Sequence, residues 1–442
     1  MRKKEFLDYM EFLQEAKKNE AKIKSFNYHD GRLFSFSTSS YRYKFLISEK
    51  VFTPNKFVNE LGFTGYNSFL NKRFSKLSEY LTNETDIKKW YSGYFGGLVG
   101  VNRHIVNDYV GNGEIFQFYD YDINKAYLTA LTGWLPTKFV KVISVEDFNS
   151  LNEMDKIPFL FFFEIKLPVI KSDFLMAIGH IKEIYKSFDF LNSKQGAEII
   201  VSEKRLSLIN QIYFKDYQIK RVFVFERGKF TFYENILQRY CQVKDSYPES
   251  FKQDALRIYG TLGQIYKYKC DKLRFDKRGI LMVNYKQVEN LSSRPHVAMW
   301  VADTVAEKLF NLISANLDKI ICWNTDGVTS TKPLSLKISK KCGDWKLKEF
   351  KGIPFLLNDT GSRLVFKNVV GGFIGATNII EKDGDFFEQI ELSYSSLKKG
   401  YLKIKRNFKI QKDLVFNEQN TFRSRIWRMR LIKEVVREYE QF

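Results

Sequence analysis

Two aspartates at the ends of predicted strands constrain the fold of this chain more than any other feature. Residues 118–127 (FYDYDINKAY) are typical of a strand that reaches Asp122 and is followed by a short helix. Residues 320–328 (IICWNTDGV) are typical of an apolar strand that turns at Asp326, because Asp-Gly between two β-like runs is a strong hairpin signal. We expect these strands to be neighbours. Their carboxylates would then form the minimal oxygen-ligand site for two Mg²⁺ ions acting on a phosphate ester.

Each aspartate also has an ordinary explanation. An isolated Asp-Gly step such as Asp326 and Gly327 is most often a tight turn and nothing more. Asp120 faces the same side of its strand as Asp122, because side chains alternate along a strand. It is therefore either a second carboxylate near the site or an exposed strand residue. We assign the ligand role to Asp122 because a short helix follows it, with Asn124 in position to cap that helix.

The composition predicts a folded protein with an anionic partner. The chain has 442 residues, of which 44% are hydrophobic, with 41 Phe and 25 Tyr, so large cores can be buried. It carries 71 Lys and Arg against 51 Asp and Glu, a formal net charge of +20, which favours a polyanion bound through its phosphates. The densest basic stretch lies between residues 403 and 430. Nucleic acid is therefore the expected class of partner.

The cysteines and histidines predict neither a disulfide framework nor a zinc site. The four histidines lie far apart, and no CxxC pair occurs among Cys241, Cys270, Cys322 and Cys342. A reducing, cytoplasmic compartment fits this pattern. No stretch approaches the ~18 consecutive apolar residues that a membrane span requires, so we expect no membrane partner.

The hydrophobic periodicity predicts a mixed α+β chain whose first domain ends near residue 93. We predict a helix over 5–24, alternating strands over 33–51 and helices again over 56–90. Two glycines after Tyr94 then break the pattern, where backbone can approach a ligand closely. Further along we predict a buried strand, a strand-helix-strand unit and two long helices, over 159–167, 199–225, 249–267 and 297–317.

Several positions are candidates for contacts with a nucleotide. Tyr127, five residues after Asp122, is placed to stack under an incoming sugar and exclude a 2′-hydroxyl, although most such tyrosines are core residues. Lys244 follows a helical pattern and would suit a triphosphate, although a single lysine is more often solvated surface. Gly260 and Gly263, in the first of the two long helices, each cost about 1 kcal/mol relative to alanine. They indicate either a closely approaching ligand or tight helix packing.

Taken together, these residues resemble family B DNA polymerases, most closely the protein-primed branch of phages and linear plasmids. Residues 122–127 (DINKAY) are similar to motif A (Asp-x-x-Ser-Leu-Tyr), and residues 324–326 (NTD) to motif C (Asp-Thr-Asp). Residues 94–97 (YFGG) resemble the Tyr-x-Gly-Gly element of the branch. Residues 199–225 resemble the segment before motif B, and residues 343–349 (GDWKLKE) the Gly-x-Trp-x-x-Glu stretch after motif C.

The resemblance implies an active site built from these motifs. Two Mg²⁺ ions, or Mn²⁺ in their place, would be held by Asp122, Asp326 and the backbone of Ile123, with Asn324 and Thr325 as neighbours in motif C. The incoming dNTP would be bound by Tyr127, Asn124, Lys244 and, from motif B, by Lys252, Arg257, Tyr259 and Thr261. The template or primer strand would be contacted by Tyr94, Gly96, Gly97 and, in a Lys-x-Tyr element, by Arg363 or Lys367.

Two motifs depart from the family pattern. Motif B (Lys-x-x-x-Asn-Ser-x-Tyr-Gly) has two registers: matching Tyr259 makes Lys252 the basic residue, whereas matching Arg257 makes Thr261 stand for the asparagine. Motif C has Asn324 in place of its first aspartate, which keeps an oxygen but removes a charge. We therefore expect a lower metal affinity or a changed metal preference. Lys125 and Ala126 also replace the usual Ser and Leu of motif A.

The implied fold class is α+β: a polymerase right hand with an antiparallel palm sheet, fingers helices and a thumb, preceded by a small α+β N-terminal domain. The implied boundaries are 1–93 for the N-terminal domain, 94–245 for the palm with motif A and a first insertion, 246–295 for the fingers helix and second insertion, 296–364 for the palm with motif C, and 365–442 for the thumb and basic C-terminal region. Residues 1–90 are short for a proofreading domain and contain no Asp-x-Glu, so we expect no 3′–5′ exonuclease.

The expected function is a DNA-directed DNA polymerase that acts as a monomer on a DNA primer–template with dNTPs. The resemblance implies protein-primed replication of a phage or plasmid genome, with a terminal protein as a further partner and the host cytoplasm as the location. Two alternatives stay open. One is a degenerate polymerase that binds DNA or a replication partner without synthesis, as Asn324 and the altered motif B indicate. The other is a polymerase with a different primer or template preference.

Overall fold

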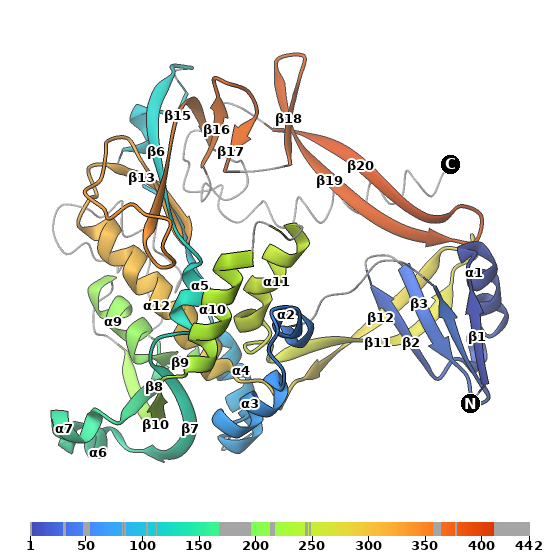
Figure 1. The fold of residues 1–442 in the computed structure, drawn as a ribbon, viewed down its shortest axis with the longest axis horizontal. Helices are drawn as coiled ribbons and strands as arrows, with labels where there is room; N and C mark the ends of the chain where they lie inside the picture. The colour runs from blue at the N-terminus through green and yellow to red at the C-terminus, as the bar shows by residue number, and fades with distance from the viewer. Residues whose placement is uncertain are drawn as a thin grey trace. The chain divides into compact units, whose positions relative to one another are not determined.

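The computed structural model forms two units. It describes residues 2–29, 32–46, 54–81, 83, 85–102, 105–111, 113–167, 196–212, 217–243, 246, 249–356, 364–375 and 378–410. Unit 1 gathers three separate segments, Met1–Val51, Tyr266–Asn290 and Asn378–Ile410, and unit 2 is built from Phe52–Ile265 and Leu291–Thr377 (Figure 1). Residues 52–93, predicted as part of the N-terminal domain, therefore lie in unit 2. The predicted palm, fingers and thumb boundaries stay a prediction.

Unit 1 is rich in β-strands and encloses an aromatic core. A sheet of order β1-β4-β3-β2 comes from the first segment, the hairpin β11-β12 from the second, and the sheet β18-β19-β20 from the third. The bounds are β1 (Arg2–Phe6), α1 (Tyr9–Lys18), η1 (Glu20–Lys22), β2 (Ser25–His29), β3 (Arg32–Ser37), β4 (Tyr41–Phe45), β11 (Tyr266–Phe275), β12 (Leu281–Glu289), β18 (Ile379–Lys382), β19 (Asp385–Ser396) and β20 (Gly400–Ile410). All three segments contribute to one core, which includes Phe12, Phe36, Phe45, Leu273, Phe275, Leu281, Leu397 and Tyr401.

Unit 2 is organised around a seven-stranded antiparallel sheet of order β17-β16-β15-β6-β14-β13-β5. Its strands are β5 (Leu98–Val101), β6 (Phe116–Ile123), β13 (Ile320–Thr325), β14 (Gly327–Ser330), β15 (Trp345–Leu356), β16 (Leu364–Asn368) and β17 (Phe373–Ile374). Tyr121 and Ile123 are buried on one face of the central strand β6. The other face of β6 carries Asp120 and Asp122, because strand side chains alternate.

A second sheet and a set of helices complete unit 2. The sheet has the order β7-β10-β8-β9, with β7 (Leu135–Ile143), β8 (Phe159–Lys166), β9 (Glu198–Ser202) and β10 (Gln218–Gly228). The helices are α2 (Pro54–Glu60), α3 (Tyr66–Arg73), η2 (Leu77–Glu79), α4 (Asp86–Ser92), η3 (Val106–Asp108), α5 (Ala126–Ala130), α6 (Val145–Ser150), α7 (Glu153–Lys156), α9 (Glu203–Ile212), α10 (Thr231–Val243), α11 (Glu249–Gly260) and α12 (Pro295–Ser314). The apolar helix α12 contacts strands of both sheets (Figure 1). The predicted α+β class is confirmed.

Most long elements predicted from periodicity are present, with corrections at their ends. The helix predicted over 5–24 is wrong at its start, because residues 2–6 pair with β4 and Asp8 caps α1 by accepting a hydrogen bond from the Glu11 backbone N–H at 2.8 Å. The helix predicted over 249–267 ends at Gly260. Gly263 therefore lies beyond the helix. A Cβ there would come within 2.8 Å of the Ala298 Cβ, so this glycine serves packing.

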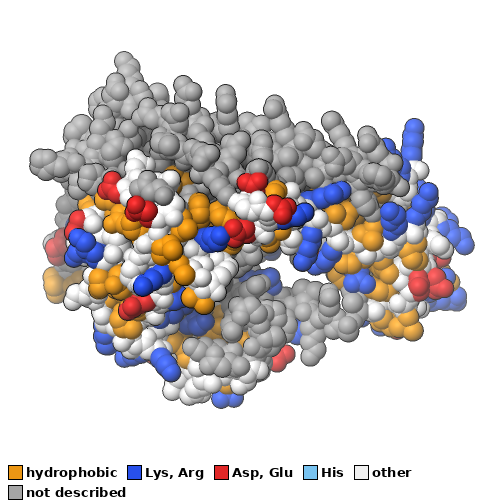
Figure 2. Space-filling view, turned by 90° about the horizontal axis from the view of Figure 1, so that it is seen from above, with side chains coloured by type: hydrophobic (Ala, Val, Ile, Leu, Met, Phe, Trp, Pro, Cys, Tyr) orange, Lys and Arg blue, Asp and Glu red, His pale blue; other side chains and the backbone are white. Residues whose placement is uncertain are grey.

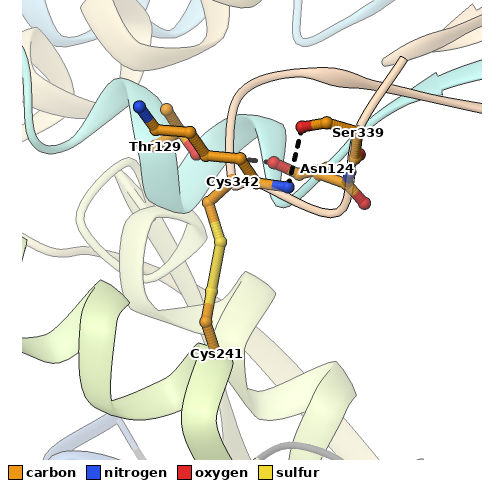
Figure 3. Close-up of a disulfide and its surroundings, with 6 residues drawn as sticks. Asn124, Thr129, Cys241, Ser339 and Cys342 are labelled. Carbon is orange, nitrogen blue, oxygen red and sulfur yellow. Dashed lines mark hydrogen bonds between the residues drawn. A yellow bond between two sulfur atoms is a disulfide. The ribbon is translucent and has the colours of Figure 1, made fainter.

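The structure has a disulfide that the cysteine spacing did not predict. Cys241 of α10 is bonded to Cys342, 101 residues away, in the loop before β15 (Figure 3). No local spacing motif could have predicted a disulfide between cysteines so far apart in the sequence. The reducing compartment expected from the cysteine spacing stays a prediction. None of the helices in the described ranges is both long and apolar enough to cross a membrane.

Candidate active site

Asp122 is held at the centre of the seven-stranded sheet by strands on both sides. In β14 the residue opposite Asp122 is Gly327, and in β15 it is Lys346. Because Gly327 follows the turn at Asp326, this register brings the β13-β14 turn directly beside Asp122. The backbone N–H of Ile123 also donates to the Asp326 carbonyl at 2.9 Å, which fixes the two motifs against each other.

The turn that carries Asp326 needs residues of special conformation. Thr325 has a left-handed backbone with φ 56°, and the Asp326 N–H donates to the Asn324 carbonyl at 2.7 Å. At Gly327 a Cβ would lie 2.9 Å from the Tyr121 carbonyl oxygen and 3.3 Å from Asp122 Oδ1. A side chain at this position would therefore push the turn away from Asp122. The predicted Asp-Gly hairpin is confirmed, and its glycine sets the approach of the two aspartates.

Burial and the charge of Asp122 raise the pKa of two carboxyl groups of the site, those of Asp326 and Asp120. Burial and then the charge of Asp122 raise the pKa of Asp326 to about 6, against the opposing hydrogen bond from Thr325 Oγ1 to Asp326 Oδ1 at 2.9 Å. Burial is also the main cause that raises the pKa of Asp120, whose Oδ1 accepts from Thr329 Oγ1 at 3.0 Å. These raised pKa values show that negatively charged groups lie close together in a site with limited access to solvent.

A cation already lies against this negative charge. The ammonium of Lys346 forms an ion pair with Asp122 from the neighbouring strand β15. Within the described residues, no three His, Cys, Asp or Glu side chains are grouped as a metal site by themselves. A metal ion here would therefore take the oxygens of Asp122 and Asp326 and complete its shell from the backbone, water or a substrate, as Mg²⁺ commonly does.

A pocket of about 210 Å³ opens over these residues. Its polar side is formed by Asp120, Asp122, Asn324 and Asp326, and Leu364, Phe366 and Ile374 line it with apolar side chains. Asn324, which stands where motif C has its first aspartate, is exposed on this lining. The amide therefore shares the pocket with the three carboxylates.

Two stacked tyrosines flank the aspartates. Tyr127 of α5 and Tyr259 of α11 have ring centroids 4.5 Å apart and an interplanar angle of 6°. Burial, followed by the charge of Asp326, raises the pKa of the Tyr127 phenol, so this hydroxyl stays protonated. The stack joins the predicted sugar-contacting tyrosine to motif B. Tyr259 is the motif residue in the register that makes Lys252 the basic residue, whereas the other register matches Arg257.

The Tyr-x-Gly-Gly loop lies against the turn of motif C. A Cβ on Gly97 would be 2.7 Å from the Tyr127 hydroxyl and 2.9 Å from Thr325 Cα, so only glycine admits this packing. Gly96 has a positive φ of 69°, and its carbonyl accepts a hydrogen bond from Arg205 at 3.0 Å. The loop therefore positions part of the wall around Asp326.

A buried ionic network that the sequence did not reveal holds this loop. Arg205 of α9 pairs with Asp303 of α12 at 2.7 Å, and the hydroxyl of Ser202 donates to the same carboxylate at 2.6 Å. Both charged side chains are almost fully buried. A lone aspartate within the apolar helix α12 was the available signal, since a charge is rarely buried without a partner.

Asn124 connects the end of β6 to the loop before β15 through hydrogen bonds. Its side-chain amide donates to the Ser339 carbonyl at 2.7 Å, so it does not cap α5, and Lys125 with φ 53° occupies the position before that helix (Figure 3). The Asn124 backbone also exchanges hydrogen bonds with Gly343 and Asp344. The predicted cap is wrong, and Asn124 instead ties motif A to the loop that carries Cys342.

The other predicted contacts are spread around α11 and β16. Arg257 is exposed on α11, and the Thr261 hydroxyl donates to its carbonyl at 2.8 Å, just beyond the helix. Lys367 is half-buried on β16, opposite Phe373 of β17. Lys244, Arg363 and the side chain of Lys252 lie outside the described residues.

The comparisons with known proteins identify the fold. No protein-family model and no curated protein sequence matches the chain. A structure of phi29 DNA polymerase complexed with primer-template DNA and incoming nucleotide substrates is similar, with a TM-score of 0.54 and 14% identity over 81% of this chain and 67% of that one. A second, of phi29 DNA polymerase complexed with single-stranded DNA, has a TM-score of 0.50 and 14% identity over 84% of this chain and 63% of that one. The chain therefore has a phi29-like polymerase fold and spans about two thirds of the length of those polymerase chains.

Proposed function

We propose that the chain is a DNA-directed DNA polymerase that extends a primer by nucleotidyl transfer. The observation that carries this proposal is the pair of carboxylates, Asp122 and Asp326, held side by side by the Gly327 register and the Ile123 hydrogen bond. The phi29-like fold supports the proposal, since one of the similar structures is phi29 DNA polymerase complexed with primer-template DNA and incoming nucleotides. The net charge of +20 suits a nucleic-acid partner.

The donor set of the pocket fits Mg²⁺, and also Mn²⁺. Asp122 and Asp326 would hold the ions, with the backbone carbonyl of Ile123 as a further oxygen ligand. When bound, the ions supply activation of the primer 3′-hydroxyl and neutralisation of the triphosphate charge. The raised pKa of Asp326 and the ammonium of Lys346 beside Asp122 support a site that attracts cations.

The tyrosine stack is the proposed floor for the incoming nucleotide. Tyr127, braced by Tyr259, would lie under the sugar and exclude a 2′-hydroxyl. Position 252 is seven residues before Tyr259 and so falls on the same face of α11, whereas Arg257 falls on a different face. We therefore favour the register in which Lys252, together with Lys244, contacts the triphosphate.

The remaining parts of the proposal concern DNA and priming. The loop of Tyr94, Gly96 and Gly97 would guide the template strand, and Lys367 or Arg363 would contact the primer. We propose protein-primed initiation with a terminal protein, a monomeric enzyme and no 3′–5′ exonuclease. A terminal-protein nucleotidylation assay with a no-primer control and a degradation assay on labelled single-stranded DNA test these parts separately.

Primer extension tests the core of the proposal. With dNTPs and Mg²⁺ or Mn²⁺, the wild-type chain should extend an annealed primer, and Asp122→Asn or Asp326→Asn should reduce extension to background. Asp120→Asn is the matched control, because it removes a charge from the same strand face without removing a proposed ligand. The proposal fails if extension survives Asp326→Asn.

Asn324 favours a second candidate function, DNA binding without synthesis. Its amide lies in the pocket where the family motif has a carboxylate, so the site has one charge fewer to hold a cation. Under this alternative the wild-type chain binds primer–template but extends it with neither Mg²⁺ nor Mn²⁺. Under the polymerase proposal, Asn324→Asp lowers the metal concentration needed for half-maximal extension.

A further inference from the structure

The N-terminal sheet of unit 1 has one open polar face. The helix α1 and the aromatic core cover the face that carries Phe36, Tyr43 and Phe45. The strand register β1-β4-β3-β2 places eight residues on the opposite face, in two rows: Lys3, Arg42, Ser37 and Ser25, and then Glu5, Lys44, Ser35 and Asn27. Six of the eight side chains are exposed, and none is aromatic or aliphatic.

Three cations lie on this open face, and its one acid, Glu5, is opposite Lys44. Lys3 and Arg42 are directly opposite in the parallel pair of β1 and β4, an arrangement that destabilises a sheet when nothing neutralises it. Among the described residues, no ion pair is formed by Lys3, Arg42 or Lys44. The hydroxyls of Ser37 and Ser25, hydrogen-bonded to each other, continue the Lys3–Arg42 row. Ser37 is buried, so the two exposed cations and the exposed hydroxyl of Ser25 are the donors of this row that suit phosphate oxygens.

The surroundings of this face have the same sign of charge. The three segments of unit 1 contain 25 Lys and Arg against 15 Asp and Glu, so about a quarter of the chain carries +10 of the total +20. Figure 2 shows several Lys and Arg side chains on the visible face of unit 1. An extended polyanion is therefore the complementary partner.

We infer that the open face of the N-terminal sheet, defined by Lys3, Arg42, Lys44 and the serines beside them, binds the phosphate backbone of duplex DNA without reading its sequence. Single-stranded nucleic acid is usually gripped by aromatic side chains that stack on bases, and the eight positions offer none. Duplex DNA presents the denser row of phosphates, about one charge per 1.7 Å of its axis. This inference goes beyond nucleotidyl transfer, because it concerns a surface in unit 1, whereas both aspartates of the proposed active site belong to unit 2.

Duplex binding measured without nucleotides tests the inference. The variant Arg42→Gln/Lys44→Gln removes two charges from the open face, and Lys18→Gln/Lys22→Gln removes two exposed charges from the helical side of the same unit. Fluorescence anisotropy with a labelled duplex, repeated over a series of KCl concentrations, gives the slope of log K against log salt. The open-face variant should reduce the magnitude of this slope by about 1.8, because each phosphate contact contributes about 0.9, while the control leaves it nearly unchanged.

Three outcomes overturn the inference: equal changes in both variants, no change in either, or a loss confined to single-stranded DNA of the same length. Thermal unfolding of both variants verifies that the sheet is intact. Ser35→Glu adds a negative charge to the middle of the open face and should also weaken duplex binding. This variant replaces Arg42→Gln/Lys44→Gln in the test if the double variant does not fold. Single-turnover extension of a saturated primer–template should stay at the wild-type rate in the open-face variant, so a failure here is distinct from a failure of the polymerase proposal.

Discussion

At the scale of single residues, the arrangement of the site rests on small side chains and on buried ones. Gly327 and Gly97 let the motif C turn lie against β6 and against Tyr127, where a Cβ would meet other atoms at 2.9 Å and 2.7 Å. Asp326 then becomes a half-buried acid beside another acid. The sequence indicated these aspartates from their places at two predicted strand ends and from the resemblance to motifs A and C. It could not show that Lys346 pairs with Asp122, because their contact depends on strand register across more than 200 residues.

His296 gives a pH prediction at the residue scale. Its ring is fully buried, stacks on Phe225 with centroids 4.6 Å apart and shares a hydrogen bond with the Tyr80 hydroxyl at 2.9 Å. Burial, followed by the charge of Arg294, lowers the pKa of His296 from 6.5 to about 3. The unfolded chain therefore binds one more proton than the folded chain between these values, and the stabilisation present above pH ~6.5 is lost as the pH falls.

The comparison with His296→Gln isolates this effect from the many carboxylates. The free energy of unfolding of the wild type should fall relative to the variant by about 1.4 kcal/mol for each pH unit below roughly 6. Urea unfolding at a series of pH values measures the difference. A difference that does not change with pH would show that His296 is not held neutral in the folded chain.

At the scale of elements, a buried ion pair links helices α9 and α12 to the loop that packs on the motif C turn. Asp303→Asn should leave the Arg205 guanidinium buried without its counter-charge, which costs about 3–5 kcal/mol of stability. Glu307→Gln is the matched control, since it breaks the more exposed pair with Lys204 between the same two helices and should cost at most about 1 kcal/mol. Urea midpoints of the two variants test this; equal losses would contradict the role assigned to Asp303.

The elements also show where sequence reasoning succeeded and where it failed. The strand β8 and the helix α12 were predicted well, because β8 is a nearly continuous apolar run and the apolar residues of α12 recur at helical spacing. The start of α1 was wrong because residues 2–6 follow their strand partner β4 and not their own helical pattern. The register of motif B could not be chosen from the sequence, and the register that we propose rests on the stacking of Tyr127 on Tyr259.

At the scale of the whole molecule, distant segments combine in ways that a linear division into domains does not predict. Unit 1 draws its core from three segments, so Phe12 of the first segment and Phe275 of the second lie in one cluster. The disulfide between Cys241 and Cys342 is a second such link, which the cysteine spacing gave no sign of. Contacts of this kind depend on the assembled fold and leave no local pattern in the chain.

The disulfide leads to a prediction about the stability of the whole chain. It closes a span of 101 residues, so its removal should restore freedom to the unfolded chain and lower the free energy of unfolding by roughly 2–4 kcal/mol. Cys241→Ser should show this loss in denaturant unfolding, and a reductant should produce a similar loss in the wild type. The same reductant should leave Cys241→Ser unchanged; a further loss there would mean that another bond had been broken.

We propose that Asp122 and Asp326 act as one unit in nucleotidyl transfer. Single-turnover primer extension by both single variants and the double variant measures whether they do. Groups that act together lose nearly all activity when either is removed. We expect Asp122→Asn, Asp326→Asn and the double variant all to show the same residual rate, with duplex binding retained. The proposal is contradicted if either single variant extends a primer at close to the wild-type rate, or if the two losses multiply in the double variant.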